Sequence, residues 1–175
     1  MSHEARMIHA LSKLSKNPTP MKEATLKVLQ ENDEVLFENG ACHVFAKCLF
    51  NELETRGYGL IGIRWELYGD QRRFSNTKHV ACAKGNTLVH FHGVEYWQDY
   101  KKRMYDVNSA HQNFEKTQFR KFEITLNDLF TVADETEFRG KLNKWDYYID
   151  EDFYEAAEKR AYLHIRNNRG KYRLS

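Results

Sequence analysis

The clearest pattern of apolar and polar positions begins just after Gly40. Apolar residues recur from there at helical spacing until Gly57-Tyr58-Gly59 interrupts the pattern. The recurring positions are Cys42, Phe45, Ala46, Leu49, Phe50 and Leu53. An apolar face that is nearly continuous indicates a helix buried in the centre of a fold. The sequence therefore predicts a central helix whose first turn carries Cys42.

Three β-rich runs follow this helix. Residues 60–67 are dominated by Leu, Ile and Trp, and residues 78–83 and 87–92 flank the turn sequence Lys84-Gly85-Asn86. The last two runs are expected to form an antiparallel hairpin. Together the three runs predict a small antiparallel β-sheet against which the central helix packs.

The pattern in the C-terminal half is mainly helical. Helices are expected over residues 96–105, 111–118, 126–130 and 152–167, and a short strand over residues 122–125. The predicted fold class is therefore α+β, with a central Cys-bearing helix, a small antiparallel sheet and a helical C-terminal half.

The two ends of the chain differ from the middle. Pro18 and Pro20 each restrict the preceding residue to extended geometry, so residues 1–20 are expected to form an N-terminal arm. Residues 166–175 are basic and lack apolar periodicity, which predicts a frayed tail. Residues 21–165 are interpreted as one domain.

Composition narrows the class of protein. The chain has 175 residues, of which 41% are hydrophobic and 14% aromatic, so it can bury a substantial core. Its 27 basic and 25 acidic residues nearly cancel, which makes nucleic acid an unlikely partner.

No apolar run approaches the roughly 18 residues of a membrane span, and the N-terminus lacks a signal-peptide pattern. We expect neither membrane insertion nor Sec export.

The cysteines point to a reducing compartment. Cys42, Cys48 and Cys82 are an odd number in a chain too large to need a disulfide framework. Reduced thiols are the simplest interpretation, and they predict a cytoplasmic protein or one delivered into a host cytosol without a Sec signal.

Candidate chemistry centres on Cys42. A cysteine in the first turn of a helix lies near free backbone amides and the positive end of the helix dipole, which stabilise a thiolate. A nearby imidazole activates such a nucleophile, and His79 at the start of a strand is placed to supply one. His90 and His92 share a face of the next strand, where His90 can orient His79. Asn39 is the nearest amide side chain for an oxyanion role.

These residues carry a resemblance to a known superfamily. The segments Gly40-Ala41-Cys42-His43-Val44-Phe45-Ala46, His79-Val80-Ala81-Cys82 and Leu88-Val89-His90-Phe91-His92-Gly93 resemble the papain-like and transglutaminase-like cysteine enzymes. In that superfamily Cys begins a helix, His lies on a strand, and Asp or Asn lies on the next strand. The third position falls here on His90, which lacks the negative charge of an aspartate.

The resemblance implies a thiol-dependent enzyme that acts on an amide. Cys42 would attack the carbonyl, His79 would transfer the proton and His90 would orient His79, with no cofactor and with a protein or peptide amide as substrate. Peptide hydrolysis, glutamine deamidation and acyl transfer share this machinery. Trp97 and Tyr96 are candidates for a cleft wall that contacts substrate. A compact chain of this kind is similar to intracellular bacterial amidases, deamidases and injected effectors.

Two alternatives remain open. Zinc takes Cys and His ligands, and Cys42, His79, His90 and His92 would be its candidate set, although they lack the tight pairs of a typical structural zinc site. The other alternative is a protein-binding module of the same fold without catalysis. Its docking segment would be residues 145–152, which combine aromatic and acidic side chains, or the basic tail.

Overall fold

The computed structural model describes the chain in five stretches. These are residues 30–39, 41–67, 76–108, 117–130 and 151–174. The predicted N-terminal arm, residues 1–20, and residues 145–150 of the aromatic-acidic segment lie outside the described residues. The account below concerns the described stretches.

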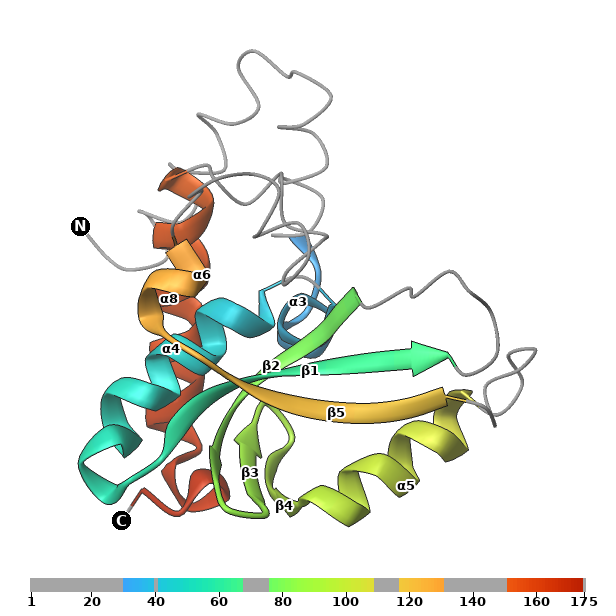
Figure 1. Ribbon diagram of the computed structural model, residues 1–175. Helices are drawn as coiled ribbons and strands as arrows, with labels where there is room; N and C mark the ends of the chain where they lie inside the picture. Colours follow the sequence, from blue (N-terminus) through green and yellow to red (C-terminus); the bar gives the residue numbers. More distant parts are fainter. Residues whose placement is uncertain (1–29, 40, 68–75, 109–116, 131–150, 175) are drawn as a thin grey trace, which may run out of the picture.

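The sheet has five strands, and every described pairing in it is antiparallel (Figure 1). The strands are β1 (Gly59–Leu67), β2 (Asn76–Lys84), β3 (Thr87–His90), β4 (Gly93–Tyr96) and β5 (Thr117–Ile124). Their order across the sheet is β4-β3-β2-β1-β5, so β2 lies at the centre. The predicted hairpin is confirmed, with Cys82 paired to Val89.

Helix α4 (Cys42–Leu53) is the central helix that the apolar pattern predicts. Eight of its twelve residues are buried, because it packs against β2 on one side and α8 (Glu151–Asn167) on the other. The helix α3 (Asp33–Asn39) directly precedes α4 in the chain and packs against it. The predicted α+β class with a central Cys-bearing helix is confirmed.

Each face of the sheet has its own apolar core, because strand side chains alternate. Val80, Cys82 and Val89 face α4. The intervening residues Ala81 and Leu88 instead belong to a second core. That second core contains Ile61, Ile63, Ala81, Leu88, Trp97, Tyr100 and Phe119, and α5 (Trp97–Asn108) contributes its aromatic rings. By the same alternation His79 and His90 lie on the α5 face of the sheet.

Several elements differ from the sequence-based expectation. Residues 93–96 form the edge strand β4, where no strand was predicted, because Gly93 adopts a positive φ of 111° that reverses the chain after β3. The expected helix over residues 111–118 is wrong at its end, since β5 begins at Thr117 and pairs along β1. The predicted helices α6 (Leu126–Phe130) and α8 are confirmed.

The basic tail is not frayed in the described part. After α8 a short 3₁₀ helix, η3 (Arg169–Tyr172), folds back so that Tyr172 and Leu174 are buried. The hydroxyl of Tyr172 donates a hydrogen bond to the Phe91 carbonyl at 3.0 Å. Only two apolar side chains anchor this segment, and two positions are too few to give the sequence an apolar periodicity.

None of the helices in the described stretches combines the length and the apolar character that crossing a lipid bilayer requires.

Candidate functional site

Cys42 is the first residue of α4 and is only 2% exposed. Burial raises the pKa of its thiol to about 12, and the nearby Glu38 carboxylate adds to the rise, although the backbone amides of Val80 and His43 hydrogen-bond to the sulfur and oppose it. The expectation that the helix start lowers this pKa is therefore wrong for this arrangement. Cys42 rests as a neutral thiol beside the backbone of β2.

His79 and His90 meet on neighbouring strands, as the sequence predicted. Their ring centroids lie 5.4 Å apart in an edge-on arrangement, and both rings contact Tyr100 of α5. His79 is 5% exposed and His90 is 2% exposed. Burial, assisted by the adjacent His90, lowers the pKa of His79 to about 4, so His79 is neutral at physiological pH.

Two carboxylates supply the negative charge that the third position lacks. The Nε2 atom of His90 lies 2.6 Å from Glu95 Oε1, and Arg103 holds the same oxygen at 2.8 Å. Glu38, near the end of α3, places Oε1 3.9 Å from His90 Nδ1. Burial opposes protonation of His90, but these two carboxylates outweigh it and raise the pKa of His90.

Glu38 is the member of the site that the sequence analysis missed. Its Oε1 lies 3.3 Å from the Nε2 atom of His92, which is about one-third exposed. Burial raises the pKa of the Glu38 carboxyl, but hydrogen bonds and charges from the surrounding histidines lower it further than burial raises it. Glu38 belongs to no motif in the sequence, and only the packing of α3 against α4 brings it to β2 and β3.

Two buried nitrogens in this cluster, His79 Nε2 and His90 Nδ1, have no hydrogen-bond partner. Glu38 Oε1 is also buried and makes no well-aligned hydrogen bond, although His92 Nε2 lies 3.3 Å from it and His90 Nδ1 3.9 Å. One ligand atom from each of Glu38, His79 and His90 lies within 4.8 Å of the others. In the described part of the chain this is the set of His, Cys, Asp and Glu side chains that gathers closely enough to hold a metal ion, and Cys42 is outside it. The structure thus groups two members of the predicted zinc set, His79 and His90, with Glu38.

The other cysteines and His43 lie in the core. The thiol of Cys82 donates to the Ala46 carbonyl at 3.4 Å, and that of Cys48 to the Glu158 carbonyl at 4.0 Å. His43 is 3% exposed and its Nε2 lies 2.9 Å from the Tyr154 hydroxyl. The three cysteines are all free thiols.

The remaining candidates are spread around the site. Trp97 is buried in the second core and stacks on Tyr100 with a centroid distance of 5.7 Å. Tyr96 ends β4 and is 61% exposed. Asn39 ends α3, and its side chain lies outside the described residues. These positions leave the substrate and oxyanion roles as predictions.

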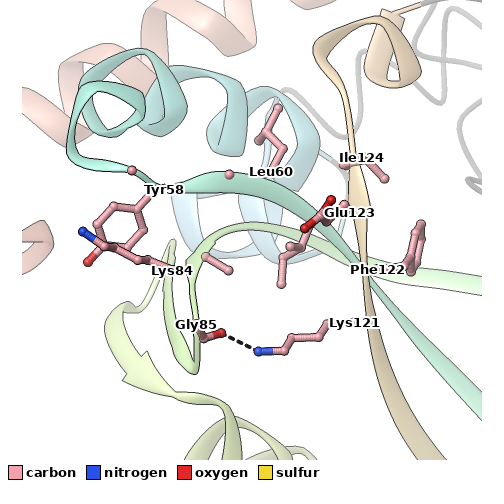
Figure 2. Close-up of a pocket in the computed structure, with 12 residues that line it drawn as sticks. Tyr58, Leu60, Lys84, Gly85, Lys121, Phe122, Glu123 and Ile124 are labelled. Carbon is pink, nitrogen blue, oxygen red and sulfur yellow. Dashed lines mark hydrogen bonds between the residues drawn. The ribbon is translucent and has the colours of Figure 1, made fainter.

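A separate hollow of about 720 Å³ lies where β1, the β2–β3 turn and β5 meet (Figure 2). Its two lysines are already engaged. Lys84 donates to the Arg56 carbonyl at 2.7 Å, and Lys121 donates to the Gly85 carbonyl at 2.5 Å. The described residues that line it do not include Cys42, His79 or His90. We therefore place the candidate site at the Glu38 cluster.

Comparisons with protein-family models, with curated proteins and with solved structures find no match for this chain.

Proposed function

We propose that the protein is a thiol-dependent enzyme acting on an amide, as a hydrolase or an acyl transferase, with Cys42 as nucleophile and His79 as base. The observation that carries the proposal is the meeting of three elements. Cys42, at the start of a buried helix, accepts a hydrogen bond from the backbone of Val80, the residue that follows His79 along β2, and the His79 ring contacts His90. This is the order of elements on which the superfamily resemblance rests.

The reaction follows from the atoms present. His79 lies on the opposite face of β2 from Val80, the residue next to Cys42, so the step requires the rearrangement that also admits substrate. The unpartnered His79 Nε2 then accepts the Cys42 proton as the sulfur bonds to the substrate carbonyl carbon. The amides of Cys42 and His43 are positioned near the sulfur and stabilise the oxyanion. His79 then returns the proton to the leaving amine, and water or another amine releases the acyl group from the sulfur.

Glu38 has a positioning role in this proposal. Its carboxylate favours the protonated form of His79, so it stabilises the imidazolium that forms during attack. Glu95 and Arg103 fix His90, whose ring in turn packs against His79. The carboxylate normally expected at the third position is thus replaced by Glu38 and Glu95 around a histidine.

Substrate access requires a change of arrangement, because Cys42 is only 2% exposed. A protein or peptide amide reaches the sulfur only after the side chains that bury Cys42 are displaced. The three free thiols support a reducing compartment such as the cytosol, and we propose that location.

The test is turnover of a peptide library, read by mass spectrometry, with wild-type protein, Cys42→Ala and the matched control Cys48→Ala. New peptide termini indicate hydrolysis, deamidated glutamine indicates deamidase activity, and amine adducts indicate acyl transfer. We expect one of these products with wild type and Cys48→Ala but not with Cys42→Ala. Products that persist in Cys42→Ala, or none with any protein, would contradict the proposal and favour a binding role.

A further inference from the structure

The cluster of Glu38, His79 and His90 has a property that the thiol chemistry does not require. A base and its orienting partner need one proton path, whereas here two buried imidazole nitrogens, His79 Nε2 and His90 Nδ1, lack a hydrogen-bond partner beside the carboxylate of Glu38. Buried polar atoms in proteins are almost always hydrogen-bonded, and an unpaired buried group costs about 1–3 kcal/mol. Two such nitrogens beside a carboxylate indicate a missing partner that satisfies them together.

We propose that Glu38 Oε1, His79 Nε2 and His90 Nδ1 form a binding site for a divalent first-row transition metal, of which Zn²⁺ is the type. Two imidazole nitrogens and one carboxylate oxygen are a donor set that zinc takes in proteins. His90 Nδ1 and Glu38 Oε1 are 3.9 Å apart, and one ligand atom from each of the three residues lies within 4.8 Å of the others. Metal–ligand distances of about 2.0–2.2 Å require the side chains to move by roughly 1 Å so that all three atoms reach one ion.

The contacts of His90 are like those that orient metal-binding histidines in proteins. Histidines that bind metals typically donate their other ring N–H to a carboxylate, which fixes the tautomer. His90 Nε2 lies 2.6 Å from Glu95, and Arg103 fixes Glu95 in turn. This arrangement makes Nδ1 the ring nitrogen of His90 that is left for a metal ion, which displaces any proton there on binding. That is the atom that lacks a partner.

His92 extends the site toward solvent. Its Nε2 lies 3.3 Å from Glu38 Oε1, and its side chain is 36% exposed. The buried ligands are therefore connected to solvent on the His92 side, which gives an ion a path of entry. Calcium and magnesium prefer all-oxygen sites, so the donor set discriminates against both.

An ion here would engage the nitrogen that His79 needs as a base. Metal binding would then switch off the proposed thiol chemistry, and this consequence rests on the proposed function. Metal binding itself does not depend on it, since Cys42 is not among the ligands.

The test is calorimetric titration of chelator-treated protein with Zn²⁺, together with the visible absorption of a Co²⁺ complex, which reports ligand geometry. We expect one equivalent of Zn²⁺ to bind to wild type and to Cys42→Ala, and neither Mg²⁺ nor Ca²⁺ to compete. Glu38→Gln, which keeps the side-chain shape, and His79→Ala should each weaken binding by at least about a hundredfold, since outer partners alone contribute 10–100-fold.

Two controls separate the site from other ligands. Glu52→Gln removes a carboxylate from an exposed pair with Arg169, and His164→Ala removes a histidine paired to Asp33; both should bind Zn²⁺ as wild type does. Circular dichroism establishes that each variant is folded. Zinc binding, together with no amide turnover by the metal-free protein in the presence of a chelator, would leave the metal site standing and refute the enzyme. No stoichiometric binding, or equal binding in folded Glu38→Gln, would overturn the metal site whatever the turnover.

Discussion

Two polar clusters in the molecule each join a carboxylate from α3 to a histidine, but they are satisfied differently. Asp33 accepts hydrogen bonds from both Arg160 and His164, the latter at 3.0 Å, so its charge is paired across α3 and α8. Glu38 faces nitrogens of His79 and His90 that have no hydrogen-bond partner. His164 also has one unpartnered nitrogen, yet that atom is alone among aromatic rings. Convergence of unpartnered atoms therefore distinguishes a candidate site from a structural ion pair.

The largest expected effect comes from breaking the paired cluster. Asp33→Asn removes the negative charge opposite Arg160 and one of the two carboxylate oxygens, and Arg160 is largely buried, with a side chain 13% exposed. Because the Asp33 side chain is 38% exposed and partly screened, we expect a loss of about 2 kcal/mol in the free energy of unfolding. Urea denaturation measures it. A change below about 0.5 kcal/mol would show that this cluster does not hold α3 on α8.

The same pair predicts a pH dependence. Burial raises the pKa of Asp33, but hydrogen bonds from Arg160 and His164 outweigh burial and hold it below its usual 3.8. A carboxyl with a lowered folded-state pKa stabilises the fold above its unfolded pKa and loses that contribution as pH falls through the folded value. Tyr172 also lies near Asp33, and it is neutral throughout this range because burial raises its pKa.

The difference in stability between wild type and Asp33→Asn should therefore be constant above about pH 5 and shrink as the pH falls below 3.8. Thermal denaturation at a series of pH values gives this difference. If the difference grows toward acid pH, the Asp33 pKa is not lowered by its partners.

Glu95→Gln tests the Glu38 cluster through a residue that contacts His90 but is not a proposed metal ligand. Glutamine keeps the shape of Glu95 but weakens its hold on His90 Nε2, now 2.6 Å away, and on Arg103. We expect zinc affinity to fall by about tenfold, equal to about 1.4 kcal/mol. The readout is the same calorimetric titration. Unchanged affinity would mean that Glu95 does not set the orientation of His90.

The smallest effect is expected for Glu38→Gln without metal. Its Oε1 lies 3.3 Å from the Nε2 atom of His92, a partly exposed pair that solvent screens, and His90 keeps its contact with Glu95 when the Glu38 charge is removed. The free energy of unfolding should change by less than about 0.5 kcal/mol. Urea denaturation in the presence of a chelator measures it. A loss as large as that of Asp33→Asn would make Glu38 a structural residue, and the contrast between the two clusters would disappear.

The sequence predicted the fold better than the site. The spacing of apolar residues in α4 and the alternation in β2 and β3 are local signals, so the central helix, the hairpin and the pairing of His79 with His90 could be derived. Glu38 carries no such signal, because its position depends on how α3 packs on α4. The pKa of Cys42 also could not be derived, since spacing places a residue at a helix start but does not report how deeply it is buried.

The C-terminal segment is another part of the fold that the sequence pattern could not predict. Tyr172 and Leu174 are too few to make a periodic pattern, yet both are buried, and the Tyr172 hydroxyl fixes the chain at Phe91, next to His90 and His92. Contacts between residues distant in sequence decided this part of the fold. Sequence patterns do not encode them in a readable form.

The central claim is that His79 serves Cys42, and the rate of iodoacetamide alkylation at each cysteine tests it most directly. Intact and digested protein is followed by mass spectrometry for wild type and His79→Ala in the presence of a chelator. Cys48 and Cys82, both buried, report alkylation through unfolding. Cys42 and Cys48 both rest as buried neutral thiols, so the account predicts that proton transfer to His79 makes Cys42 react faster than Cys48 in wild type and that His79→Ala removes this advantage. Equal rates at Cys42 and Cys48 in wild type, or a Cys42 rate indifferent to His79→Ala, would contradict it.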